Sequence, residues 1–152
     1  MRLDRSWMVL VLLAGAVPSA RASSPDETPS EPQMIAALEA RIEQAPPRDQ
    51  CFLYADLVHK VTEFSARAYA AGDIEKSNAM LVRVQQLARK VHLSMGENDK
   101  RLKNAEILLR HAAYRLKEML HATTYEDRPL VEEALTQVNQ VDTEAMMQVL
   151  KK

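Results

Sequence analysis

The feature that most constrains the fold is a repeat of apolar residues at alternating three- and four-residue steps. The repeat runs through residues 74–95 and again through 99–123. This spacing places one apolar stripe along an α-helix, whereas a half-buried strand would alternate at every second residue. The stripe positions are Ile74, Ser77, Leu81, Val84, Ala88, Val91 and Met95, followed by Leu102, Ala105, Leu109, Ala112, Leu116, Met119 and Thr123. Long amphipathic helices are therefore the expected building blocks.

Three further segments show the same period and have recognisable ends. Residues 48–71 are expected to form a helix that stops at Gly72, residues 128–150 a helix that follows Asp127, and residues 31–45 a shorter helix opened by Ser30. Three glycines, two phenylalanines and 5% aromatic residues disfavour a β-sandwich or barrel. We therefore expect an all-α fold, an up-down antiparallel four-helix bundle with an extra short N-terminal helix.

The first 22 residues have the pattern of a secretory signal peptide. Arg2 and Arg5 form a basic head, and an apolar run follows over residues 8–17. Ten residues are too few for a helix to cross about 30 Å of hydrocarbon. The small residues Ala20 and Ala22 suit a cleavage site between Ala22 and Ser23. The mature protein is therefore expected in the periplasm or outside the cell.

The expected mature chain contains one domain. Residues 23–30 hold Ser, Pro and acidic residues without an apolar side chain, which is typical of a disordered spacer. Residues 31–152 then form the helical-bundle domain, and no segment in them is apolar for long enough to span a membrane. The formal charge of −1 for the whole chain argues against a nucleic-acid partner, which usually calls for a strongly basic protein.

No catalytic constellation is recognisable in the chain. It lacks a Gly-rich phosphate loop, a Gly-x-Ser-x-Gly elbow and an HExxH motif, so we predict no catalytic residue, no cofactor and no metal. Cys51, the single cysteine, excludes an internal disulfide framework and a multi-cysteine metal cluster. Its place near a helix start leaves three alternatives open: a buried apolar residue, an intermolecular disulfide or a reactive thiol.

The most unusual surface is the side of helix 99–123 opposite its apolar stripe. At 100° per residue, one isoleucine, one tyrosine, one glutamate and two histidines gather there. These residues are Ile107, His111, Tyr114, Glu118 and His121. A solvated face seldom collects such residues, so we expect a cover. The alternatives are the first helix through Ile35, Leu38 and Ile42, a second subunit, or a metal bound with the Glu-x-x-His spacing of Glu118 and His121.

Two short segments resemble parts of known families. The segment from Ala71 through Ala88 to His92 resembles the last hairpin of soluble periplasmic b-type cytochromes, which implies His92 as a haem ligand and Met34 as its partner. Leu135-Thr136 is similar to the LTxxQ boxes of small helical periplasmic chaperones. As a whole, the chain resembles small exported all-helical bacterial proteins without an assigned activity, a resemblance that implies no site residue.

The leading hypothesis from the sequence is an exported helical bundle that acts through protein–protein contact. Its partner is either an unknown protein or a second copy of the chain, held through the face that contains Tyr114. The alternatives are a ligand-, metal- or haem-binding periplasmic bundle and a small periplasmic chaperone.

Overall fold

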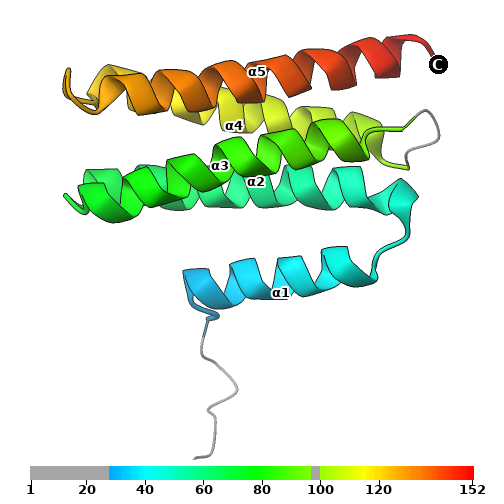
Figure 1. Ribbon diagram of the computed structural model, residues 1–152, viewed down its shortest axis with the longest axis horizontal. Coiled ribbons are helices and arrows are strands. Elements are labelled where there is room, and N and C mark those ends of the chain that lie inside the picture. Colours follow the sequence, from blue (N-terminus) through cyan, green and yellow to red (C-terminus); the bar gives the residue numbers. More distant parts are fainter. Residues whose placement is uncertain (1–27, 97–99) are drawn as a thin grey trace, which may run out of the picture.

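The computed structural model describes residues 28–96 and 100–152, and these residues form five α-helices without a strand. The helices are α1 (Glu31–Gln44), α2 (Pro47–Ala70), α3 (Ile74–Ser94), α4 (Leu102–Ala122) and α5 (Arg128–Leu150), drawn in Figure 1. The expected all-α fold is therefore confirmed for this part of the chain. The expected signal peptide, residues 1–22, and residues 23–27 of the spacer lie outside the described residues. None of the described helices is long and apolar enough to cross a membrane.

The helix ends follow local sequence signals. The Ser30 hydroxyl accepts the Gln33 backbone N–H, and the Gln33 side chain accepts the Ser30 N–H at 2.8 Å, which completes a capping box for α1. Gly72 ends α2 with φ of +82°, a left-handed conformation that glycine adopts without steric cost. Asp73 then caps α3 by accepting the Lys76 N–H at 3.1 Å. The expected start of α4 near residue 99 is corrected to Leu102.

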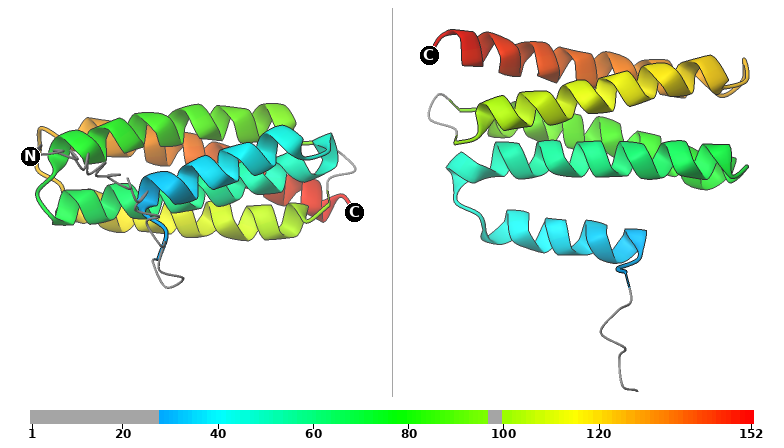
Figure 2. Two further views of the ribbon diagram at one scale, coloured as in Figure 1. Left: turned by 90° about the horizontal axis from the view of Figure 1, so that it is seen from below. Right: turned by 180° about the vertical axis from the view of Figure 1, so that it is seen from behind.

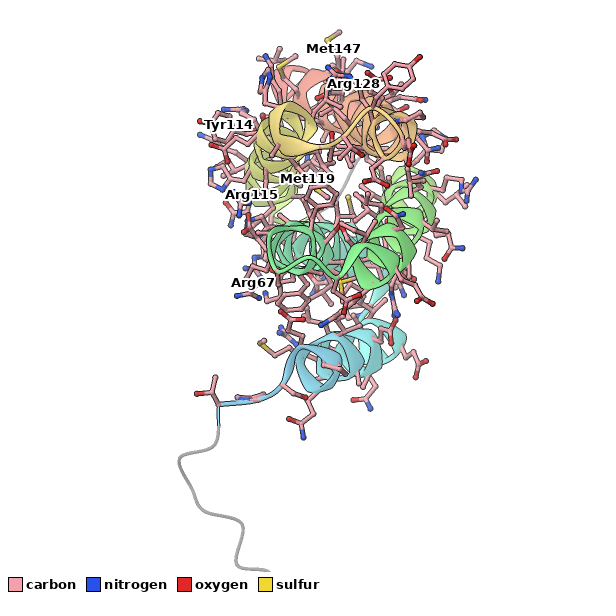
Figure 3. All side chains as sticks on the ribbon, turned by 90° about the vertical axis from the view of Figure 1, so that its left-hand side faces the viewer. Arg67, Tyr114, Arg115, Met119, Arg128 and Met147 are labelled. Carbon is pink, nitrogen blue, oxygen red and sulfur yellow. The ribbon has the colours of Figure 1, made fainter. Side chains whose placement is uncertain are left out.

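Helices α2 to α5 form two layers, in which α2 contacts α3 and α4, and α5 also contacts α3 and α4 (Figure 3). Helices α2 and α4 run in the same direction, because their starts and their ends both meet. The Lys100 N–H donates to the Arg48 carbonyl at 3.2 Å, and the Thr124 N–H donates to the Tyr69 hydroxyl at 3.0 Å. Helices α3 and α4 are consecutive but do not contact each other within the described residues. The connection between α3 and α4 therefore joins helices that lie diagonally across the bundle.

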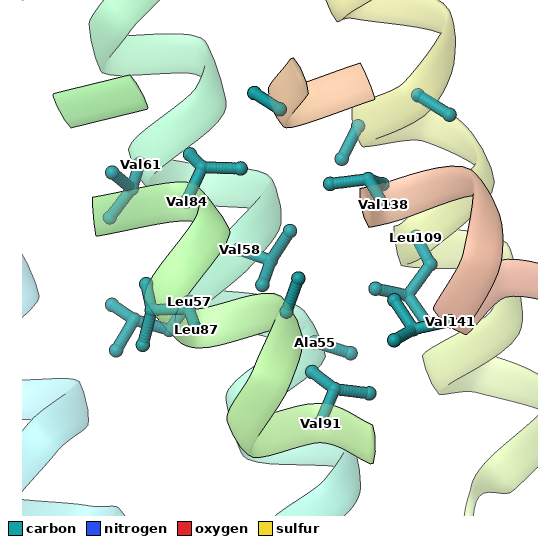
Figure 4. Packing of buried hydrophobic residues seen from close by; sticks show 14 of the residues in the cluster. Ala55, Leu57, Val58, Val61, Val84, Leu87, Val91, Leu109, Val138 and Val141 are labelled. Atoms are coloured by element: carbon teal, nitrogen blue, oxygen red, sulfur yellow. The ribbon is translucent and has the colours of Figure 1, made fainter. Parts of the chain in front are cut away.

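The core fills the space between these two layers. The stripe residues predicted from the sequence supply most of it, and Leu57, Leu81, Leu109 and Leu116 are its largest fully buried side chains. Figure 4 shows Leu109 of α4 beside Val138 and Val141 of α5. Each buried Leu or Val side chain contributes about 1.5–3 kcal/mol through the apolar surface that it removes from water. The bundle is therefore stabilised by the residues that the helical period places on the buried side of each helix.

Two buried serines mark a close approach of α2 and α3. The Ser65 hydroxyl donates to the Ser77 carbonyl at 3.0 Å, and the Ser77 hydroxyl donates to the Ser65 carbonyl, also at 3.0 Å. Both side chains are fully buried. Because each short side chain reaches the backbone of the other helix, the two helices have little space between them at this point.

Helix α1 packs on the outer side of the pair α2 and α3 (Figure 2). It buries Ile35, Leu38 and Ile42 there. Glu31 forms ion pairs with Arg67 of α2 at 3.2 Å and with Lys76 of α3 at 3.0 Å. Contacts between α1 and α4 are absent from the described residues. The alternative in which the first helix covers the outer side of α4 is therefore wrong.

Candidate functional site

The outer side of α4 is open to solvent. We define the α4 outer face by the five residues that the helical arithmetic selected, Ile107, His111, Tyr114, Glu118 and His121. All five are exposed, Tyr114 to 65% and Ile107 to 37%. Figure 3 shows Tyr114 directed away from the bundle. A tyrosine exposed to this extent in the middle of a well-formed helix gains little from folding, so it is available for a partner.

An ion-pair chain joins the α4 outer face to α2. The Arg115 Nε lies 3.3 Å from a carboxylate oxygen of Glu63, and its Nη1 lies 3.2 Å from a carboxylate oxygen of Glu118. Glu118 is therefore held by a guanidinium rather than paired with His121. Within the described residues, no group of three or more His, Cys, Asp or Glu side chains is placed to hold a metal ion. Among the described residues, Glu118 and His121 therefore gain no third metal ligand.

Two histidines meet at the α2 edge of this face. The imidazole of His59 in α2 lies 6.0 Å from that of His111 in α4, measured between ring centroids, with 55° between the ring planes. Burial lowers the pKa of His59 below its ordinary value, Glu63 opposes this change, and His111 reinforces it. Burial beside α4 therefore favours the neutral form of His59. The side chain of His59 is half-buried beside α4.

Cys51 lies in the first turns of α2 with its side chain fully buried. A thiol in this position has no surface from which to attack a reagent or a second chain. It packs with the core as a small apolar residue would.

We predict that Cys51 reacts with the thiol reagent DTNB only after unfolding. In the native protein the 0% exposed side chain should delay colour formation, whereas in urea the single cysteine should release one equivalent per chain. The measurement is the time course of labelling in buffer and in denaturant. Complete labelling of the native protein within the mixing time would contradict the buried position.

The residues that the cytochrome resemblance implied do not come together. The Nδ1 of His92, near the end of α3, lies 2.6 Å from a carboxylate oxygen of Glu144 in α5. Met34 lies in the first turn of α1, and its neighbour Glu31 pairs with Lys76 at the opposite end of α3. Sixteen residues of helix separate Lys76 from His92, about 24 Å at 1.5 Å per residue. A single iron could not contact both Met34 and His92.

A shallow cavity of about 250 Å³ lies beside His92, between α3 and α5. Its lining residues are Ala88, Arg89, His92, Gln137, Gln140 and Val141. This volume is below the range of about 300–1,000 Å³ that is usual for small-molecule and cofactor sites. This cavity beside His92 is therefore small for a haem or another cofactor.

Sequence reasoning selected the residues of α4 but missed those that α2 brings to them. No sequence spacing links His59 to His111, or Glu63 to Arg115, because α2 and α4 are not consecutive in the chain. Comparisons of the chain with protein-family models, curated proteins and solved structures find no match. Only the residues of the α4 outer face themselves therefore indicate what this face does.

Proposed function

We propose that this protein is an exported, up-down antiparallel four-helix bundle that acts through protein–protein contact, with a second copy of the chain bound to the α4 outer face. The observation that carries the proposal is Tyr114, which is 65% exposed on a face that α1 leaves uncovered and that also contains Ile107, exposed to 37%. Tyrosine is among the residues enriched where proteins bind each other, because it combines a large apolar ring with a hydroxyl. The signal-peptide pattern of residues 1–22 supports export.

The spacing of the face supports a second copy as the partner. In a two-fold dimer the same patch meets itself, so residues equally far from the axis lie opposite each other. Two antiparallel copies of α4 that cross near Tyr114 place Ile107 opposite His121 of the second copy. The same arrangement brings His111, three residues before Tyr114, near Glu118 of the second copy, four residues after it, so that a hydrogen-bond donor approaches an acid. The contact is one helix wide, so we expect an affinity in the micromolar range.

Sedimentation velocity on the protein recovered from expressing cells tests this proposal. We expect the mass to change from one copy to two between low micromolar and submillimolar concentration, and the processed N-terminus to be Ser23. Tyr114→Asp should keep the protein monomeric, because it places a charge at the centre of the contact. The matched control is Tyr125→Asp, since Tyr125 is 90% exposed in the turn after α4 and lies outside the face.

Two results would contradict the dimer. One is a wild-type protein that stays monomeric over the whole concentration range. The other is a dimer that Tyr114→Asp and Tyr125→Asp weaken equally, since this would mean that the contact lies elsewhere or that added charge acts without regard to position.

A further inference from the structure

The imidazoles of His59 and His111, at the α2 edge of α4, lie slightly farther apart than two imidazoles that bind one metal ion. Two imidazoles bound to one tetrahedral zinc ion have ring centroids about 5 Å apart, given a Zn–N distance of about 2.0 Å. The centroids of His59 and His111 are 6.0 Å apart, so a small side-chain rotation would bring one nitrogen of each ring to a common ion. The two residues lie in the middle of α2 and α4, whose starts and ends are held together by hydrogen bonds.

We propose that His59 and His111 together bind one transition-metal ion of the zinc, nickel or copper class, with water at the remaining coordination positions. Neutral imidazole is a preferred ligand for these ions, whereas carboxylate and carbonyl oxygens suit magnesium and calcium. Within the described part of the chain, neither imidazole forms a hydrogen bond or an ion pair. His92 differs, because Glu144 already engages its Nδ1.

The charges around the pair leave room for a cation. Asp56 and Glu63 lie one turn before and one turn after His59, and both carboxylates act on its imidazole electrostatically. The two nearby basic groups are each paired with one of these acids. Lys60 lies 2.6 Å from Asp56, and Arg115 lies 3.3 Å from Glu63. The charges of these two acids are thus balanced by the charges of Lys60 and Arg115.

The test is a titration of the full chain, purified without a histidine tag, with ZnCl2, NiCl2 and CuCl2, followed by calorimetry and thermal unfolding. We expect one ion per chain and a rise in the melting temperature with each of the three ions, because an ion that bridges α2 and α4 binds only the folded state. Copper should bind most tightly of the three. MgCl2 is the negative control and should change neither measurement.

Single substitutions locate the site. His111→Ala, at an exposed position, should weaken zinc binding at least about tenfold, since even outer residues that orient ligands often contribute 10–100-fold. His59→Ala should have the same effect, with circular dichroism to verify that the helices form. The matched controls are His121→Ala on the same helix and His92→Ala, which should bind as the wild type does.

The site shares His111 with the proposed dimer contact but needs no residue of a second copy, so the monomeric Tyr114→Asp variant should retain zinc binding. Three results would overturn the site: binding of much less than one ion per chain, affinity that His111→Ala leaves unchanged, or an equal loss in His121→Ala.

Discussion

Replacing Leu109 by alanine is expected to lower the free energy of unfolding by about 3 kcal/mol, within the range of about 2–5 kcal/mol found for buried Leu→Ala changes. Leu109 is fully buried in α4, next to Val138 and Val141 of α5 (Figure 4). The change removes apolar surface and leaves a cavity, which these β-branched neighbours are too stiff to fill. Urea unfolding followed by circular dichroism measures the effect as a shift of the midpoint with an unchanged slope.

The matched control for this change is Leu93→Ala. Leu93 lies at the end of α3 and is 81% exposed, so the same truncation should alter the unfolding free energy by less than about 0.5 kcal/mol. Equal losses for the two variants would mean that Leu109 does not occupy the core. A reduced slope for Leu109→Ala alone would indicate that the variant no longer unfolds in one step.

The stripe that contains Leu109 could be predicted from the sequence because helical period is a local property. Leu81 and Val84 in α3, and Leu109 and Leu116 in α4, were placed on one face by counting residues, and all four are fully buried. The same arithmetic placed Tyr114 on the opposite side of α4, where it is exposed. Neither inference required knowledge of the neighbouring helix.

The neighbours themselves could not be predicted. Each helix carries a similar apolar stripe, so the period gives no preference for α2 over α3 as the partner of α4. The choice becomes visible only in contacts between distant residues, such as Arg115 with Glu63. The position of α1 could not be predicted for the same reason, because its three apolar residues suit more than one groove. The ion pair of Glu31 in α1 with Lys76 places α1 against α3.

Only part of the candidate site could be predicted from the sequence. The residues of the α4 outer face share one helix, whereas the approach of His59 to His111 depends on the pairing of two helices that are separated in the chain by α3. The angle of a residue around its own helix distinguishes core from surface, but it cannot distinguish solvent from the flank of another helix. The half-buried position of His59 beside α4 could not be predicted for this reason.

Two core positions, one in α2 and one in α3, hold a buried serine where leucine would be usual. Ser65 and Ser77 satisfy each other, since each hydroxyl donates to the carbonyl of the other at 3.0 Å. Such an exchange requires that α2 and α3 approach near the lower end of the usual axis separation of about 8–10 Å. A larger side chain would therefore have to force the helices apart.

Ser65→Leu is accordingly expected to lower the free energy of unfolding by about 3 kcal/mol, even though it makes the core more apolar. About 1 kcal/mol comes from the lost hydrogen bond, and about 1–3 kcal/mol comes from the strain of extra volume in a closed space. Ser65→Ala removes the same hydrogen bond without adding volume, so it should cost only about 1 kcal/mol. Urea midpoints of the two variants separate these contributions. If the leucine variant were as stable as the alanine variant, α2 and α3 would have room to move apart, and the serines would then be tolerated in the core rather than required by the packing.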